Sequence, residues 1–185
     1  MTAHLHPERP HVSIRFSASE IASRVDVMAQ ELAKQLPADT LVVSVLKGSF
    51  VFAADLIRAL SRAGADWAMD FLTLSSYGTG TQSSGTVRIV RDIVDDVRNR
   101  DVLLVDDILE SGLTLSFARN LLKERGAHRV WVCTLLDKPH KRRAELKADF
   151  VGFEAGDEFL VGYGLDWAHR FRGLPYIGVV EKSEG

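Results

Sequence analysis

The chain has 185 residues, which is the length of about one domain. Its 46% hydrophobic and 26% charged residues are ordinary for a globular protein and exclude a fully disordered chain. The 23 basic and 25 acidic residues give a formal net charge of −2. This balance argues against a protein dedicated to binding nucleic acids or anionic membranes.

The chain has one cysteine, Cys133, so no disulfide can form within it. Cys133 lies in the apolar run at residues 130–136, where we expect it to behave as a small core residue. No apolar stretch reaches the roughly 18 residues of a transmembrane helix. The polar residues 1–10 lack the apolar centre of a signal peptide. We therefore expect a cytoplasmic protein without a membrane span.

The N-terminal part of the chain is predicted to form an arm and one long helix. Residues 1–16 are expected to be a loose arm or a short edge strand. Apolar residues at spacings of three and four predict a helix over residues 17–36. Ser17 and Glu20 form a capping-box pattern at the start of this helix.

A buried strand and a second helix are predicted next. The apolar run at residues 41–46 is typical of a strand that is buried on both faces. Residues 47–49 end this strand, and residues 50–63 are predicted to be a helix. Two further strands are predicted over residues 67–75 and 87–91.

The segment between these two strands, residues 76–85, has three glycines and almost no apolar side chains. We expect it to be a flexible loop, and loops of this length and composition often carry function.

The remaining elements complete an alternation of strands and helices. Residues 102–105 form the purest apolar strand of the chain, residues 113–125 are predicted to be a helix, and residues 130–136 a strand. Further short strands are expected at residues 150–153, 159–163 and 176–180. This alternation predicts an α/β fold with a central, mostly parallel sheet flanked by helices. Since no linker is evident, residues 1–185 are expected to form a single domain.

The most informative stretch reads V-L-L-V-D-D-I-L-E-S-G-L-T at residues 102–114. An apolar strand leads into Asp106 and Asp107, and a turn of small residues then precedes a helix. Ligands of open α/β sheets bind beyond the carboxyl ends of the strands, and backbone N–H groups at such a turn suit a phosphate. Two carboxylates beside a phosphate suit sugar hydroxyls, or a Mg²⁺ ion held through water. The competing interpretation is a solvated strand end with Ser111 as helix N-cap, but the strand before the acids and the helix after them favour a binding site.

This stretch resembles the signature of the type I phosphoribosyltransferases, which bind 5-phosphoribosyl-1-pyrophosphate (PRPP). Within them, the chain most resembles the hypoxanthine (hypoxanthine-guanine) phosphoribosyltransferases. The resemblance extends from about residue 41 onward, in segments that keep the family's order and spacing. These segments are L-K-G-S-F at residues 46–50, S-S-Y-G at 75–78, L-L-D-K at 135–138, F-V-G-F-E at 150–154 and V-G-Y-G-L-D at 161–166.

The resemblance implies a set of residues that bind PRPP and its metal. The 5′-phosphate would be cradled by Glu110, Ser111, Gly112, Leu113 and Thr114. Asp106 and Asp107 would contact the ribose hydroxyls, directly or through magnesium. The pyrophosphate would be bound by Lys47, Gly48 and Arg172, with a cis peptide between Leu46 and Lys47. Asp166 would bind a second Mg²⁺ through the pyrophosphate.

The resemblance also implies residues that bind the purine and assist the reaction. Lys138 would donate to the exocyclic O6, Phe159 would stack on the base, and Leu160 would bond to the base through its backbone. Glu110 would take the proton from N7 of the base. Ser76 and Tyr77 would lie on a lid loop that excludes water from the reaction centre.

Taken singly, these residues have structural interpretations as well. Lys47 and Arg172 are compatible with solvated charges, Phe159 with the core, Asp166 with a cap on residues 167–171, and Lys138 with an exposed loop. Their co-occurrence at the family's spacing favours the functional interpretation. Two positions depart from the family: Glu110 stands where the purine enzymes usually carry Asp, and Asp106 stands where close relatives usually carry Glu.

The sequence therefore predicts a Mg²⁺-dependent purine phosphoribosyltransferase of the salvage pathway. It would convert hypoxanthine, and also guanine, with PRPP into the nucleotide and pyrophosphate. A small hood built from the N-terminal arm and the C-terminal segment would hold the base, and the resemblance implies a homodimer or homotetramer. One alternative is a transferase that prefers xanthine or guanine. The other is a non-catalytic, PRPP-sensing regulator that binds nucleic acid, which the net charge of −2 disfavours.

Overall fold

The structure, a computed structural model, describes residues 10–77 and 86–181. Its larger sheet contains β2 (Leu41–Leu46), β3 (Met69–Tyr77), β4 (Thr86–Arg91), β5 (Asp101–Leu109), β6 (Arg129–Asp137) and β7 (Phe150–Glu154). Its smaller sheet contains β1 (Val12–Phe16), β8 (Leu160–Val161) and β9 (Ile177–Val180). The helical elements are α1 (Ala18–Gln35), α2 (Phe50–Arg62), α3 (Leu113–Glu124) and the short 3₁₀ turn η1 (Pro139–Lys141).

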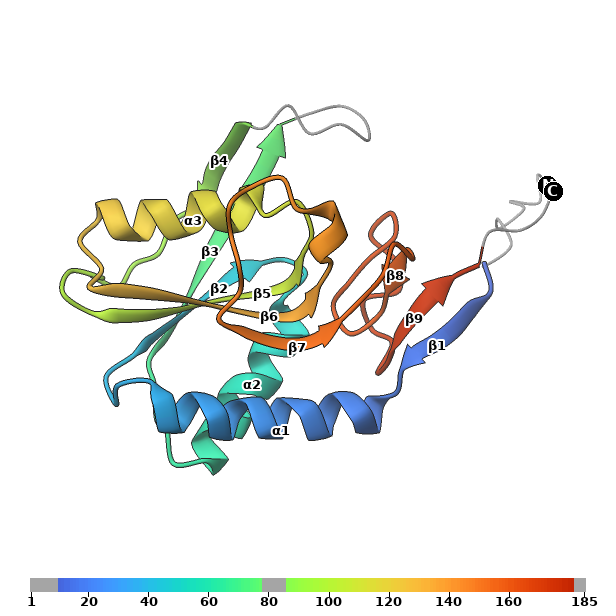
Figure 1. The fold of residues 1–185 in the computed structure, drawn as a ribbon, viewed down its shortest axis with the longest axis horizontal. Coiled ribbons are helices and arrows are strands. Elements are labelled where there is room, and N and C mark those ends of the chain that lie inside the picture. Colours follow the sequence, from blue (N-terminus) through green and yellow to red (C-terminus); the bar gives the residue numbers. More distant parts are fainter. Residues whose placement is uncertain (1–9, 78–85, 182–185) are drawn as a thin grey trace, which may run out of the picture.

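The larger sheet has the strand order β4-β3-β2-β5-β6-β7. Its neighbouring strands are parallel except for β4, which pairs with β3 in the antiparallel direction. Figure 1 shows α3 on one face of this sheet and α1 and α2 on the other. The predicted fold class, a central and mostly parallel sheet flanked by helices, is confirmed.

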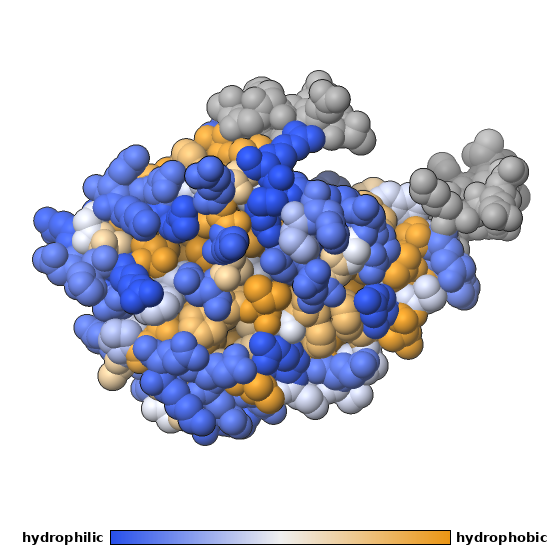
Figure 2. Space-filling model, viewed as in Figure 1, coloured by the Kyte–Doolittle hydropathy of each residue, from blue (hydrophilic) through white to orange (hydrophobic). Residues whose placement is uncertain are grey.

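Helix α1 begins as its sequence predicts. Ser17 is the N-cap and forms a capping box with Glu20, because the Ser17 Oγ accepts from the Glu20 N–H at 3.3 Å and the Glu20 Oε2 accepts from the Ser17 N–H at 2.8 Å. The buried face of the helix consists of Ile21, Val25, Met28, Ala29 and Leu32. Figure 2 shows hydrophilic residues over the outward surfaces of α1 and α3. Both helices are therefore amphipathic, as expected for layers that cover a sheet.

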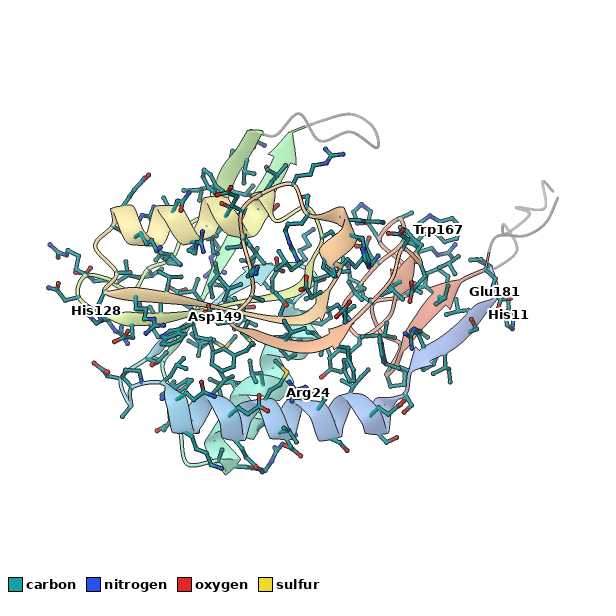
Figure 3. The ribbon with its side chains drawn as sticks, in the orientation of Figure 1. His11, Arg24, His128, Asp149, Trp167 and Glu181 are labelled. Carbon is teal, nitrogen blue, oxygen red and sulfur yellow. The ribbon has the colours of Figure 1, made fainter. Side chains whose placement is uncertain are left out.

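Each face of the larger sheet carries one apolar core. The core under α1 and α2 includes Leu103 and the predicted core residue Cys133, and the core under α3 includes Leu104 and Val132. At the β7 edge, Arg24 of α1 donates through Nε to the Gly152 carbonyl at 3.0 Å and through Nη2 to the Val151 carbonyl at 2.7 Å. Figure 3 labels Arg24 between α1 and β7, and its guanidinium satisfies carbonyls that the edge strand leaves free.

The smaller sheet joins the two ends of the described chain, in the order β1-β9-β8 with antiparallel pairing. Of the two possibilities for residues 1–16, residues 12–16 form an edge strand, whereas residues 1–9 lie outside the described part. The strand predicted over residues 159–163 is shorter than expected and covers only Leu160–Val161. The chain leaves extended geometry there because residues 162–164 have positive φ angles.

Two strands extend at least two residues beyond their predicted ends. Strand β5 continues from the apolar run through both aspartates to Leu109, since β6 pairs with it along this whole length. Strand β3 extends to Tyr77, so Ser76 and Tyr77 are paired with β4 and do not belong to a loop. Within residues 10–77 and 86–181, no helix has the length and apolar character needed to cross a membrane.

Candidate active site

A cavity of about 280 Å³ lies at the carboxyl ends of β2 and β5, the place where open α/β sheets bind ligands. It brings together residues from two parts of the chain that the sequence analysis singled out separately. Its polar lining includes Lys47, Gly48, Asp106, Asp107, Glu110, Ser111, Gly112 and Thr114. The lining does not include six other predicted residues, namely Leu113, Lys138, Phe159, Leu160, Asp166 and Arg172.

The turn after β2 forms one wall of the cavity. The peptide between Leu46 and Lys47 is cis, as the resemblance implied. A Cβ at Gly48 would overlap the carboxylate of Asp107, so this position has room only for glycine. Ser49 ties this turn to β2: its hydroxyl hydrogen-bonds to the Ser44 hydroxyl at 2.7 Å and donates to the Val45 carbonyl.

The two aspartates lie side by side within β5, at the floor of the cavity. Burial, followed by the charge of Asp107, raises the pKa of Asp106 well above its ordinary value. Burial also raises the pKa of Asp107, although hydrogen bonds and the positive charge of Arg172 oppose this effect. Two adjacent acidic side chains can accept hydrogen bonds from neighbouring hydroxyl groups of a sugar.

The turn from β5 into α3 offers its backbone to the cavity. Gly112 is the N-cap of α3 in left-handed geometry, with φ of 79°, and has no side chain to cap the helix. Ser111, the candidate N-cap, lies one position earlier; its Oγ accepts from the Leu113 N–H at 3.4 Å, and its carbonyl accepts from the N–H groups of Arg143 and Ala144 at 2.9 and 3.0 Å. A helix N-terminus after a glycine turn is suited to a phosphate.

The side chain of Lys138 is only 4% exposed and reaches the edge of this turn. Its Nζ donates to the Glu110 Oε1 and to the Glu158 carbonyl, each at 2.8 Å, and its backbone N–H donates to the Leu109 carbonyl. The exposed-loop interpretation of Lys138 is therefore wrong. Glu110 itself is 43% exposed, and the Lys141 Nζ lies 3.8 Å from its Oε1.

Phe159 follows Glu158 directly and is 53% exposed, so it does not belong to the core. Its neighbour Leu160 is buried and pairs with Val179 in the smaller sheet. Lys138 donates to the carbonyl of Glu158, so its buried ammonium group contacts the residue that directly precedes Phe159. A planar ligand with a hydrogen-bond acceptor on its edge fits such a pair of groups.

Asp166 and Arg172 form an ion pair, with 2.6 Å between the Asp166 Oδ1 and the Arg172 Nη2. The Arg172 Nη1 also donates to the Gly164 carbonyl at 2.6 Å, so this side chain is not a solvated charge. The Asp166 Oδ2 accepts from the His169 N–H at 2.8 Å, which is the capping role considered for Asp166. Trp167, labelled in Figure 3, follows Asp166 in this segment between β8 and β9.

The lid prediction falls mostly outside the structure. Ser76 and Tyr77 end β3, residues 78–85 lie outside the described residues, and the role of Ser76 and Tyr77 over the reaction centre stays a prediction.

Sequence reasoning missed Arg142 as part of the site. Its Nη1 donates to the Glu110 carbonyl at 3.1 Å and its Nη2 pairs with the Asp137 carboxylate. Arg142 therefore links the turn that begins at Glu110 to the end of β6 at Asp137. The basic run at residues 140–143 was a visible signal, but the sequence alone could not show which of its members faces inward.

The carboxylates fit a metal ion that arrives with its substrate. Among residues 10–77 and 86–181, no group of three or more His, Cys, Asp or Glu side chains could hold a metal ion by itself. Mg²⁺ commonly uses one or two carboxylates together with phosphate oxygens and water. Asp106 and Asp107 provide carboxylates of that kind in the lining of the polar cavity, whereas Asp166 is not part of that lining and is paired with Arg172.

Comparison with known families agrees with this geometry. A family model described as a phosphoribosyl transferase domain matches residues 17–167. The chain belongs to the phosphoribosyltransferase family. Among the relatives of this phosphoribosyltransferase, the hypoxanthine-guanine phosphoribosyltransferase of Bacillus subtilis (strain 168) is 47% identical over 172 residues, which cover 92% of this chain and 93% of that protein.

Two further relatives of this phosphoribosyltransferase carry similar names. The hypoxanthine phosphoribosyltransferase of Escherichia coli (strain K12) is 41% identical over 91% of this chain and 95% of its own. A crystal structure of a hypoxanthine phosphoribosyltransferase from Staphylococcus aureus matches with a TM-score of 0.86 and 38% identity, and the match covers 91% of each chain.

Proposed function

We propose that this phosphoribosyltransferase transfers the 5-phosphoribosyl group of PRPP to hypoxanthine, and also to guanine, giving IMP or GMP and pyrophosphate. The observation that carries the proposal is the position of Lys138. Its buried Nζ lies between the Glu110 carboxylate and the carbonyl preceding the exposed ring of Phe159. A 6-oxo purine stacked on Phe159 would present O6 to Lys138 and N7 to Glu110.

The names of the relatives support this choice over the alternatives. The B. subtilis and E. coli proteins are named hypoxanthine-guanine and hypoxanthine phosphoribosyltransferases. A non-catalytic regulator is therefore not favoured, and a preference for xanthine is an outcome that the assay below distinguishes.

In the proposed reaction, the bond from C1′ of the ribose to pyrophosphate breaks, and a bond from C1′ to N9 of the purine forms. The 5′-phosphate would be held by the backbone of residues 110–114, and the ribose hydroxyls by Asp106 and Asp107. Lys47, Gly48 and Arg172 would orient the pyrophosphate. Glu110 would accept the proton of N7 as the purine becomes a nucleotide. Leu160 would contribute its backbone to the base.

We further propose Mg²⁺ as the metal, with one ion at the pair of aspartates in β5 and a second ion bound by Asp166 through the pyrophosphate. When bound, it would neutralise the negative charge that develops on the leaving pyrophosphate. The smaller sheet would form the hood over the base within a single domain. The homodimer or homotetramer and the cytoplasmic location stay predictions of the sequence.

The test is an absorbance assay of the purified protein with PRPP and Mg²⁺ against hypoxanthine, guanine, xanthine and adenine. We expect turnover with hypoxanthine and guanine and formation of the matching nucleotides. Turnover with xanthine above that with hypoxanthine would replace our assignment by the xanthine-preferring alternative. Binding of PRPP without turnover of any base would favour a regulator.

A further inference from the structure

The loop that carries Asp166 and Arg172 has an anchor on α2. The Tyr163 hydroxyl donates to the Asp55 Oδ2 at 2.7 Å, and the Tyr163 ring is buried. Burial, followed by the hydrogen bond to Asp55 and the charge of Asp55, raises the pKa of the Tyr163 phenol. The hydroxyl is thus a neutral donor to an acidic acceptor, which makes a strong kind of hydrogen bond.

This anchor holds a segment of unusual backbone. Three consecutive residues have left-handed geometry, with φ of 95° at Gly162, 49° at Tyr163 and 101° at Gly164. A tyrosine rarely adopts this geometry, because its Cβ approaches the following carbonyl. The backbone bonds Tyr163 N–H to Leu174 carbonyl and Gly164 N–H to Arg172 carbonyl, at 2.9 and 3.0 Å, close the segment on itself. The Tyr163 side chain ties the closed segment to a helix outside it.

Helix α2 connects Asp55 to the turn at residues 47–49, called here the pyrophosphate turn because Lys47 and Gly48 are proposed to bind pyrophosphate. The helix begins at Phe50, directly after Lys47, Gly48 and Ser49, and Asp55 lies on it. The segment at residues 162–164 also contacts the pyrophosphate turn directly. A Cβ at Gly164 would overlap the Gly48 carbonyl, so the two backbones touch. The segment therefore meets the pyrophosphate turn at Gly164 and the following helix at Tyr163.

We propose that Tyr163 and Asp55 are positioning residues for pyrophosphate. On this view, their hydrogen bond sets the place of Gly164, whose carbonyl holds Arg172, and Arg172 in turn holds Asp166. Neither Tyr163 nor Asp55 lines the cavity at the ends of β2 and β5. The inference rests on the proposed function, because it assigns Arg172 and Asp166 to the pyrophosphate part of PRPP.

The experiment compares two ligands that use different parts of the site. Calorimetry would measure the binding of magnesium pyrophosphate and of IMP, which carries no pyrophosphate, to the parent protein and to variants. The variants are Tyr163→Phe, which removes the hydroxyl and keeps the ring, and Asp55→Ala, which removes the acceptor. Asp55→Asn keeps an acceptor oxygen. Arg58→Ala is the control, since Arg58 pairs with Asp55 at 3.4 Å on the exposed side of α2.

We expect Tyr163→Phe and Asp55→Ala each to weaken pyrophosphate binding about tenfold, and to raise the KM for PRPP by a similar factor with kcat less affected. IMP binding should stay within about twofold of the parent. The double variant should be no weaker than the weaker single variant, because both changes remove the same interaction. Asp55→Asn should lose less pyrophosphate affinity than Asp55→Ala, because it keeps an acceptor oxygen but not its charge, and Arg58→Ala should bind pyrophosphate like the parent.

Parent-like pyrophosphate binding by Tyr163→Phe would overturn the proposal. An equal loss of IMP binding would also overturn it, because the hydrogen bond would then support the fold in general. If the parent protein itself binds neither ligand and turns over no purine, the proposed function fails and this inference falls with it.

Discussion

Replacing Glu110 by Gln separates the chemical role of its carboxylate from its structural role. Glutamine has the same length, so its amide oxygen can still accept from the Lys138 Nζ, which lies 2.8 Å from the Glu110 Oε1. The ionic part of this contact is lost, but Glu110 is 43% exposed and Lys138 keeps the Glu158 carbonyl. Because glutamine keeps the hydrogen bond and Glu110 is half-exposed, the structural cost is about 1 kcal/mol, which corresponds to a factor of about five.

The catalytic cost is expected to be much larger. A positioned general base contributes about 10²–10⁴-fold to the rate, which corresponds to about 3–5 kcal/mol of activation free energy. Steady-state assays with hypoxanthine should show kcat reduced at least about a hundredfold in Glu110→Gln. Calorimetry should show PRPP affinity within about fivefold of the parent.

The conservative change Glu110→Asp is the matched control. It restores the residue that the purine enzymes usually carry and shortens the side chain by about 1.5 Å. We expect its kcat to stay within about tenfold of the parent, since the carboxylate is retained. Parent-like turnover of Glu110→Gln would refute the assignment of the base, and loss of its PRPP binding would make Glu110 a structural member of the phosphate turn.

Four further outcomes are expected. Lys138 offers only donors, so kcat/KM for adenine, with an amino group at position 6, should lie about 10⁴-fold below that for hypoxanthine; comparable values would show that Lys138 does not read this position. Chelation of metal ions should abolish turnover and Asp166→Asn should raise the Mg²⁺ concentration needed for half-maximal rate, whereas full activity in excess chelator would exclude a metal. Gly48→Ala should abolish PRPP binding, because its Cβ would overlap a carboxylate, while Gly173→Ala, whose Cβ would meet nothing within 4 Å, should bind PRPP normally. Burial acts to raise the pKa of Asp70, but three backbone N–H groups outweigh it and lower this pKa. The stability that Asp70 contributes is therefore complete above the unfolded value of about 3.9 and is lost as the pH falls through the lower folded value. Denaturant unfolding should show Asp70→Asn less stable than the parent by about 1–3 kcal/mol at pH 7, and the difference should shrink below about pH 4.

Local patterns predicted the helices well, because the signals that start and stop a helix are short. The capping box of Ser17 and Glu20 is one such signal, and the structure forms it. The end of β5 was predicted four residues early, since Asp106 and Asp107 resemble polar residues at a strand end. They stay in the strand because β6 supplies partners there, and pairing between distant segments is not visible in a local pattern.

For the site, too, local sequence patterns predicted some residues and missed those that depend on distant partners. Lys47, Gly48, Asp106, Asp107 and residues 110–114 were predicted to be functional, and all of them except Leu113 line one cavity. Side chains that act through another residue were not predicted. Arg142 and Tyr163 contact partners 32 and 108 positions away in the chain, at Glu110 and Asp55, so neither could be found from its neighbours in sequence.

The location of Asp106 and Asp107 inside a paired strand has a consequence for the thermodynamics of ligand binding. Carboxylates on a loop would lose backbone freedom each time a ligand bound, whereas the backbone of these two is already ordered when the sheet forms. The backbone entropy of these two residues is therefore lost once, when the protein folds, and is not lost again each time a ligand binds. Substrate then meets acceptors whose main chain needs no rearrangement, and the mobility required for entry and release has to be provided by other segments.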